Sequence, residues 1–461
     1  MKKYNIRIYI LSLVMLLMAQ SCNKMLEVTP PNETLVEDAL KTPEDVQKLL
    51  NSCYDVLANS LNGRAQLFNE LLGDNLDIPL NNDDFKEIFN RTTIFFNGTT
   101  GGLLADFYIC IYRVNVLDKE MGNIPGLSAA EKQRISAEAH FLRAICNFEL
   151  VKLWAQPYGF TANNTHDGIT IRTEPDQTPK PRNRVGEVYA QILSDLNDAA
   201  ANLPDQNGFY ADKNAAKALM AKVYFQMNDF SNAAQNADAV INSGAYQLSD
   251  SINRFDNLNS GSEYIFQLVS TGLNDNRSGA FSGNYRTNNN NIPQLRLSRE
   301  LYDLIQFRSS DKRRSLVKLF NPGTENEYIG TNKFNNDFFN VPYLHLTEMM
   351  FIRAESYGEL NQNLSVAVND LNKLLERAYG SGVVVLAPQA QSTEIINTAR
   401  DEKRLELFGE GIRVQDLKRR GTKGESIKIR NAPWNCNGMV IQFPVSENTV
   451  GFKMNPEGGC N

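Results

Sequence analysis

The sequence predicts a mainly α fold: a tetratricopeptide-like helical-repeat (α-α superhelix) scaffold with long loop insertions and minor β structure. Three observations support this prediction. Apolar residues recur at helical spacing over several long segments. Two segments fit helical hairpins with small residues where the two backbones approach closely. The copies are separated by polar segments of unequal length, which predicts an interrupted solenoid rather than a plain array.

The first half of the chain contains four predicted helices. The first covers residues 42–58, where Thr42 suits the N-cap and Pro43 suits the first helical position. Apolar residues spaced three and four apart predict the others. These three helices are expected at residues 103–121, 130–154 and 185–203.

The segment 215–243 fits the tetratricopeptide template. Ala221 lies on its first helix and Ala233 and Ala237 lie on its second, so small side chains face each other across the hairpin. The pair Asn228-Asp229 supplies the turn. We therefore expect these residues to be committed to packing.

A second hairpin is expected at residues 344–378. Its segment Phe351-Ile352-Arg353-Ala354 repeats Phe141-Leu142-Arg143-Ala144 of the predicted helix 130–154. A single alanine-rich hairpin is weak evidence, because any amphipathic hairpin resembles this repeat. Two good copies and two partial ones make the repeat interpretation the better one.

Three insertions rich in Asn, Asp, Gly and aromatic residues interrupt the repeats, at residues 76–102, 157–184 and 249–339. Weak alternation at 263–270 predicts a short strand. A further helix is expected at 393–409, followed by an irregular tail from Gly421. Insertions carried on a rigid scaffold commonly hold binding residues.

The N-terminus has the features of an export signal. Lys2, Lys3 and Arg7 precede an apolar stretch at residues 8–19. This run of about a dozen residues is shorter than the roughly 20 that a membrane-spanning helix needs. We therefore expect the mature chain to be exported without a spanning helix.

A lipid anchor is predicted by Ala19-Gln20-Ser21-Cys22, which resembles a bacterial lipobox. Cleavage would remove residues 1–21 and leave a lipidated Cys22 at the mature N-terminus, where several acyl chains hold a protein firmly. The alternative is an ordinary secretory signal in which Cys22 is incidental.

The net charge of the chain limits its possible partners, and its length limits the number of domains. Removing residues 1–21 takes the net charge from −6 to −9, which argues against nucleic acid as a partner. A chain of 461 residues has room for two or three domains of about 150 residues. We expect an N-terminal helical-repeat region at 22–245 and a C-terminal region with the loop insertions at 246–461, in one compact unit.

Five cysteines follow Cys22, and none has metal-ligand spacing. Cys110 and Cys146 lie in helical patterns and are expected to be small core residues. Cys436 and Cys460 lie in a loop-rich tail in an oxidising compartment, and the sequence leaves open whether they form a disulfide.

Four motifs stand in a specific order along the chain. They are Cys22-Asn23-Lys24-Met25-Leu26-Glu27-Val28 with Pro30 and Pro31; Phe141 to Ala144 with Leu153-Trp154 and Tyr158-Gly159; Arg404 to Arg413 with Asp416 to Arg419; and Phe443-Pro444-Val445 with Asn455-Pro456. In this order they resemble the SusD/RagB family over nearly the whole mature chain. One departure is Ala155-Gln156, which interrupts the tryptophan- or tyrosine-glycine join that usually follows the long helix in this family.

This resemblance implies a surface-exposed, lipid-anchored protein of the cell outer membrane. Such a protein binds an oligosaccharide (or peptide) nutrient and passes it to a SusC-like TonB-dependent transporter, over which it closes like a lid. We expect binding without catalysis, no cofactor and no metal among the site residues, and the sequence leaves open whether a calcium ion is bound.

The residues themselves give no positive sign of catalysis. His140, His166 and His345 have no metal-site spacing and no convincing nucleophile beside them. Arg404, Glu406, Glu410 and Arg413 are expected to form i,i+3 and i,i+4 ion pairs around a helix end at Gly409. The alternative function is a secreted hydrolase with paired carboxylates on a helical scaffold, because 53 acidic residues offer many pairs.

A sugar site needs flat aromatic faces together with amide or guanidinium groups. The residues of these types that we expect to contact a ligand are Phe95, Phe96, Asn97, Arg277, Asn284, Tyr285 and Arg286. The site would then lie where insertions 76–102 and 249–339 converge, and Tyr285→Ala would weaken binding with little change in melting temperature. The alternative is that Phe95 and Phe96 only pack their loop, with the site around Trp434.

Overall fold

The computed structural model describes residues 40–256, 262–289 and 291–460. Helix accounts for 52% and strand for 7%, which confirms the mainly α prediction. The predicted signal segment and Cys22 lie outside the described residues. None of the helices in the described part of the chain is long and apolar enough to cross a membrane.

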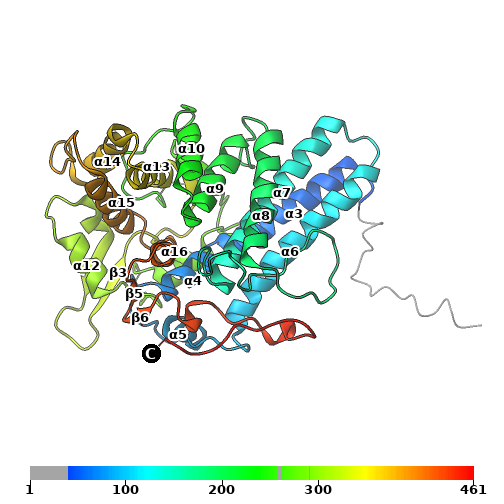
Figure 1. Cartoon of the computed structure of the whole chain (residues 1–461). Helices are drawn as coiled ribbons and strands as arrows, with labels where there is room; N and C mark the ends of the chain where they lie inside the picture. The colour runs from blue at the N-terminus through cyan, green and yellow to red at the C-terminus, as the bar shows by residue number, and fades with distance from the viewer. Residues whose placement is uncertain (1–39, 257–261, 290, 461) are drawn as a thin grey trace, which may run out of the picture.

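The elements follow one another as Figure 1 shows. The α-helices are α3 (Pro43–Leu61), α4 (Arg64–Leu72), α5 (Asp83–Asn90), α6 (Gly98–Glu120), α7 (Ala129–Trp154), α8 (Val185–Asn202), α9 (Lys213–Gln226), α10 (Phe230–Ile241), α11 (Gly279–Tyr285), α12 (Arg299–Gln306), α13 (Leu346–Leu360), α14 (Leu364–Tyr379), α15 (Ser392–Glu406) and α16 (Arg413–Thr422). The strands are β1 (Tyr264–Leu268), β2 (Val317–Phe320), β3 (Tyr328–Thr331), β4 (Val341–His345), β5 (Lys428–Ile429) and β6 (Ala432–Pro433). Short 3-10 turns are η1 (Met121–Asn123), η2 (Lys312–Leu316), η3 (Asn437–Met439) and η4 (Val445–Glu447).

Helices α3, α6 and α7 lie side by side at the N-terminal end of the molecule (Figure 1). Thr42 caps α3 in a capping box with Asp45, and Pro43 occupies the first turn, as the sequence predicts. Helix α6 begins at Gly98, five residues before the predicted start. The reason is Asn97, whose side chain accepts a hydrogen bond from the backbone N–H of Thr100 and starts the helix early.

Successive helices pack on one another as α7, α8, α9, α10, α13 and α14, which forms the predicted superhelix. Ala221 of α9 and Ala233 and Ala237 of α10 are fully buried. Asn228 makes the turn between these two helices with a φ of 60°. The predicted hairpin at 215–243 is therefore confirmed.

The second hairpin begins later than predicted. Residue Leu344 belongs to β4, and α13 starts at Leu346 after His345, whose side chain accepts from the N–H of Glu348. The strand arises because β4 pairs with β1 in an antiparallel ladder. That pairing also confirms the strand predicted at 263–270.

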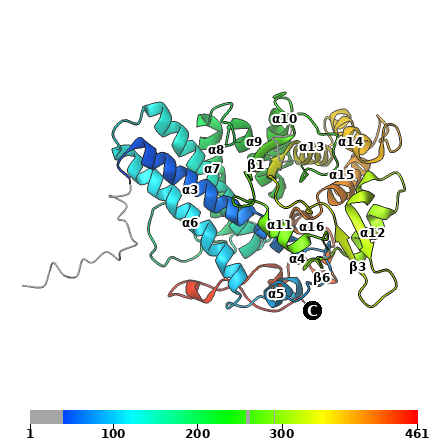
Figure 2. The same cartoon turned by 180° about the vertical axis from the view of Figure 1, so that it is seen from behind.

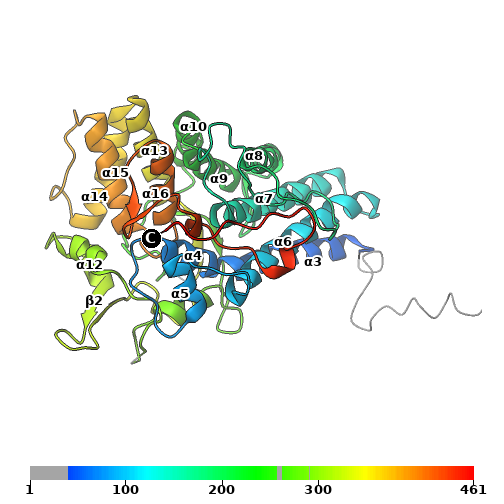
Figure 3. The ribbon, with the colours of Figure 1, turned by 60° about the horizontal axis from the view of Figure 1, so that its bottom comes forward.

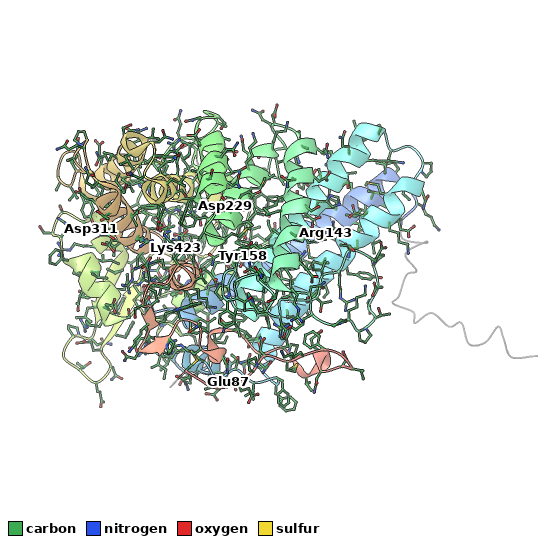
Figure 4. All side chains as sticks on the ribbon, viewed as in Figure 1. Glu87, Arg143, Tyr158, Asp229, Asp311 and Lys423 are labelled. Atoms are coloured by element: carbon green, nitrogen blue, oxygen red, sulfur yellow. A yellow bond between two sulfur atoms is a disulfide. The ribbon has the colours of Figure 1, made fainter. Side chains whose placement is uncertain are left out.

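The repeated Phe-x-Arg-Ala motif has a physical basis in the two helix pairs. Arg143 of α7, labelled in Figure 4, donates to Asp195 of α8 through Nε and Nη2 at 2.9 and 2.7 Å. Arg353 of α13 donates to Asp370 of α14 through the same two atoms, both at 2.7 Å. Such two-pronged contacts fix the angle between the paired helices.

The C-terminal segment lacks long elements, as predicted, but it packs against the body of the molecule. In Figure 3 it runs across α4 and α6. The N–H of Ile441 donates to the carbonyl of Leu153 at 2.8 Å, and Asn455 donates to the carbonyl of Trp154 at 2.9 Å. Cys436 and Cys460 form a disulfide that closes the segment on itself.

Candidate ligand-binding site

A groove of about 300 Å³ lies between α3, the connection from α8 to α9, and β1. We name it the α3–β1 groove. Figure 2 shows α3, α9 and β1 on the same face of the molecule. The residues that line the groove are Asn51, Tyr54, Asp55, Ala58, Phe209, Tyr210, Phe266, Gln267, Leu268, Val269 and Arg277.

Two aromatic side chains project at the mouth of the groove. Phe209 is 63% exposed and Tyr210 is 39% exposed. A tight turn presents them: Gly208 adopts a φ of 63°, and the N–H of Tyr210 donates to the carbonyl of Asn207. Exposed aromatic faces of this kind stack against apolar ligand surfaces.

Tyr54 supports this aromatic pair from below. Its ring meets that of Tyr210 edge-on, with centroids 5.1 Å apart. Its hydroxyl donates to Glu138 at 2.7 Å and accepts from the N–H of Ala211 at 3.0 Å. Burial raises the pKa of Tyr54, and the charge of Glu138 adds to this, so the phenol stays protonated and holds the aromatic connection in place.

Arg277 supplies a guanidinium at the edge of the groove. Nη1 lies 2.5 Å from Oδ1 of Asp55 on α3, and Nη2 lies 2.5 Å from Oδ1 of Asp275. A guanidinium carries five N–H donors, so these two contacts leave donors for a ligand. Asp55 is half exposed and can accept at the same time.

Side-chain amides on α3 and β1 add further polar groups to the groove. The Oδ1 atom of Asn51 accepts a hydrogen bond from the hydroxyl of Tyr210 at 3.3 Å, so the amide N–H₂ of Asn51 takes no part in that bond. Gln267 of β1 has an Oε1 atom without a hydrogen-bond partner among the described residues. Aromatic faces, amides, a carboxylate and a guanidinium therefore meet at one place.

Of the seven residues predicted to contact ligand, the groove contains Arg277. Phe95 and Phe96 lie just before α6, with ring centroids 4.4 Å apart, and Phe96 is 69% exposed. They border the C-terminal segment, where the N–H of Val445 donates to the carbonyl of Phe95. Asn97 is buried, because it caps α6 and donates to Glu87 at 2.8 Å.

The other three predicted residues lie on or just after α11. Asn284 donates to the carbonyl of Ala280 within that helix at 2.7 Å. Arg286 donates to the carbonyl of Asn336 and pairs with Asp337, both at 3.0 Å. Neither residue joins Arg277 in the groove.

Tyr285 is fully buried, and its ring centroid lies 5.0 Å from that of Phe334. This burial contradicts the premise that Tyr285 can be truncated with little change in melting temperature, and we now expect Tyr285→Ala to be destabilising. Tyr285 and Phe281 lie four residues apart on α11 and therefore share a helix face. The ring of Phe281 stacks on the same Phe334 ring, with centroids 4.7 Å apart. The two insertions do meet, since the N–H of Asp77 donates to the carbonyl of Arg296. No residue of the insertion 76–102 lines the groove that contains Arg277.

Sequence reasoning missed the aromatic pair Phe209-Tyr210 and the α3 residues Asn51 and Asp55. One signal was present: two adjacent aromatic residues follow Asn207-Gly208 in a short polar connection between helices, where nothing in the pattern buries them. The α3 residues carry no such signal, because polar residues on an exposed helix face are ordinary.

The C-terminal motif makes long-range ion pairs rather than the predicted local ones. Arg413 contacts Asp74 through Nε at 2.8 Å and Nη2 at 2.9 Å. Arg404 pairs with Glu300 at 2.8 Å. The prediction of i,i+3 and i,i+4 pairs is therefore wrong. The cause is that α15 ends at Glu406, so the last residues of the motif leave the helix.

The two carboxylates of this motif are buried among cations. Arg254 lies 3.0 Å from Glu406 and 2.5 Å from Glu410, and Lys333 lies 2.7 Å from Glu410. Burial alone would raise the pKa of each carboxyl, but the neighbouring cations outweigh it and hold both pKa values below their usual range. Permanently charged and paired carboxylates of this kind stabilise the fold and are poor proton donors.

The histidines also have structural partners. His140 lies between Asp118 and Asp198, at 3.0 and 2.7 Å. His345 lies 3.4 Å from Glu410. Within the described ranges, no group of three or more His, Cys, Asp and Glu side chains is placed to hold a metal ion.

Comparison with known proteins gives one consistent family. A SusD-like family described as "Starch-binding associating with outer membrane" matches residues 24–225, and the SusD family matches residues 301–439. SusD-like protein P2 of Formosa agariphila is 27% identical over 505 residues, which cover 96% of this chain and 94% of that protein.

Solved structures share the fold. A SusD superfamily protein from Bacteroides thetaiotaomicron superposes with a TM-score of 0.78 at 21% identity, over 90% of this chain and 100% of that one. A laminarin-binding SusD-like protein superposes with a TM-score of 0.69 at 21% identity, over 91% of this chain and 100% of that one. The chain therefore belongs to the SusD/RagB family of non-catalytic binding proteins.

Proposed function

We propose that this protein is a cell-surface lipoprotein that binds an oligosaccharide in the α3–β1 groove and passes it to a SusC-like TonB-dependent transporter. The observation that carries the proposal is the exposed pair Phe209-Tyr210 beside Asn51, Asp55 and Arg277. Stacking faces next to paired hydrogen-bonding groups suit the C–H surfaces and hydroxyls of a sugar. The laminarin-binding neighbour with the same fold supports a carbohydrate over a peptide.

The proposed anchor rests on the sequence and on the family description. The lipobox-like Ala19-Gln20-Ser21-Cys22 supports a lipidated cysteine at the mature N-terminus. The matching family is described as associating with the outer membrane, which fits an anchored surface protein.

Cys22→Ala should release the protein from the membrane and leave its fold intact. The anchor is chemically separate from the helical body, and acyl chains contribute about 0.8 kcal/mol per buried methylene, so loss of the anchor removes the direct attachment to the bilayer. Membrane fractionation with palmitate labelling measures this. Persistent lipid label in the variant would rule out the proposed anchor.

Phe209→Ala should weaken oligosaccharide binding at least tenfold, or by about 1.4 kcal/mol, with no change in melting temperature. The ring is 63% exposed, so its loss removes a stacking face without opening a cavity. Calorimetric titration of the purified mature protein with laminari- and malto-oligosaccharides provides the measurement.

Phe307→Ala is the matched control, because Phe307 is 81% exposed at the end of α12, outside the groove. It should bind as the wild type does. Phe96→Ala tests the site predicted at the first insertion. Loss of binding in Phe96→Ala, with Phe209→Ala unaffected, would move the site from the groove to the start of α6.

A further inference from the structure

The charged groups at the α3–β1 groove pair with one another and leave an excess of one negative charge. Arg277 contacts Asp55 and Asp275 at 2.5 Å each, so one guanidinium faces two carboxylates. Of the described residues that line the groove, Asp55 and Arg277 are the charged ones. Together with Asp275 they carry a net charge of −1, and none of the other described residues that line the groove is a cation.

The carboxylate beneath the aromatic pair is also compensated. Glu138 accepts the hydroxyl of Tyr54, and its other oxygen pairs with Arg134 on the same helix. The floor of the groove therefore adds a neutral phenol rather than a charge. A ligand therefore meets a surface that is weakly negative and carries hydrogen-bonding groups.

We propose that the α3–β1 groove selects neutral oligosaccharides and discriminates against glycans that carry uronate, sialate or sulfate groups. This inference rests on the proposed function and names its ligand class. A sugar hydroxyl both donates and accepts, so adjacent hydroxyls can accept from Arg277 and donate to Asp55 without breaking their contact.

An anionic group lacks that option. It must either approach two carboxylates or detach Arg277 from them, which leaves Asp55 and Asp275 unpaired beside a third negative charge. Specificity of this kind comes from the repulsion of the wrong ligand as much as from attraction of the right one. The discrimination should therefore fall as ionic strength rises.

The test compares ligands that differ in charge but share a backbone. Purified full-length mature protein is titrated calorimetrically with laminarin and with sulfated laminarin of equal length. A wider panel contains malto-, xylo- and manno-hexaose as neutral probes and hexamers of galacturonate and alginate as anionic probes. We expect saturable binding of at least one neutral probe, and binding at least tenfold weaker for its charged counterpart.

The double variant Asp55→Asn/Asp275→Asn keeps the side-chain shapes and removes both negative charges. It should reduce the discrimination against the sulfated ligand at least tenfold, even if neutral binding also changes. The control is Asp83→Asn/Asp303→Asn, which makes the same change of charge at two exposed positions outside the groove and should leave the ratio unaltered.

The outcomes separate this inference from the proposed function. Equal or tighter binding of the anionic probes, or an unchanged ratio in Asp55→Asn/Asp275→Asn, overturns the inference and leaves oligosaccharide binding in place. If no carbohydrate in the panel binds, both proposals fail.

Discussion

Glu355→Ala should lower the free energy of unfolding by about 3–5 kcal/mol, because it removes the buried carboxylate that three cations share and leaves Lys403 and Arg419 with Asp416 as their remaining carboxylate. Glu355 of α13 is fully buried. Its carboxylate lies 2.6 Å from Arg419, 3.0 Å from Lys403 and 2.8 Å from Arg400. Arg419 and Lys403 are themselves buried, so water cannot replace the lost partner. Urea denaturation followed by circular dichroism measures the change.

Glu300→Ala serves as the control, because Glu300 is an exposed partner of Arg404 and such surface pairs contribute little.

The pH dependence of stability gives a second check. Burial would raise the pKa of Glu355, but Arg419, Lys403 and Arg400 outweigh it and depress it. The stabilisation by Glu355 is therefore present above the ordinary glutamate pKa of about 4.3 and is lost as the pH falls through the depressed value. Equal stability of Glu355→Ala and wild type at pH 7 would contradict this account.

Tyr285→Ala should also lower the free energy of unfolding by roughly 3–5 kcal/mol, the usual range for removal of a large buried aromatic ring. Tyr285 is fully buried against Phe334, so truncation leaves a cavity in the aromatic cluster. Oligosaccharide affinity of the folded fraction should not change, since the ring does not reach the groove. Thermal melts and calorimetric titration of the same preparation measure both quantities.

Tyr285→Phe separates the ring from the hydroxyl. The phenolic oxygen is buried and has no hydrogen-bond partner among the described residues. Removing an unpaired buried polar group is neutral or stabilising by up to about 1–3 kcal/mol. Tyr285→Phe should therefore be at least as stable as wild type. A variant that folds normally but loses ligand affinity would return Tyr285 to the binding site.

Several elements follow from local sequence alone. Thr42-Pro43 marks the start of α3, and Ala221, Ala233 and Ala237 mark a closely packed hairpin. These signals are readable because the groups that satisfy them lie within a few residues of each other, or on the two arms of one hairpin. The order of the family motifs extends the same local information over the chain and identifies the family.

The sequence also determined the role of the C-terminal motif but not its partners. Its charges were expected to stabilise the fold, and the structure pairs them within the core. Arg413 pairs with Asp74 and Glu410 pairs with Arg254, and each pair is separated by more than a hundred residues in the sequence. Spacing along the chain predicts which side chains share a helix face, but it carries no information on which distant segment returns to that face.

The groove shows the same limit for function. The sequence contained every residue type that a sugar site needs, and Arg277 was among the predicted contacts. Only the tertiary structure decided that Arg277 lines one groove with Asp55 and Phe209, because the three come from an insertion, the first described helix and a turn between repeats. It also decided that Tyr285 faces the core. The physical reason is that a binding surface is assembled from loop ends whose directions are set by the packing of the whole helical body, whereas a helix or a cap is set by its own neighbours.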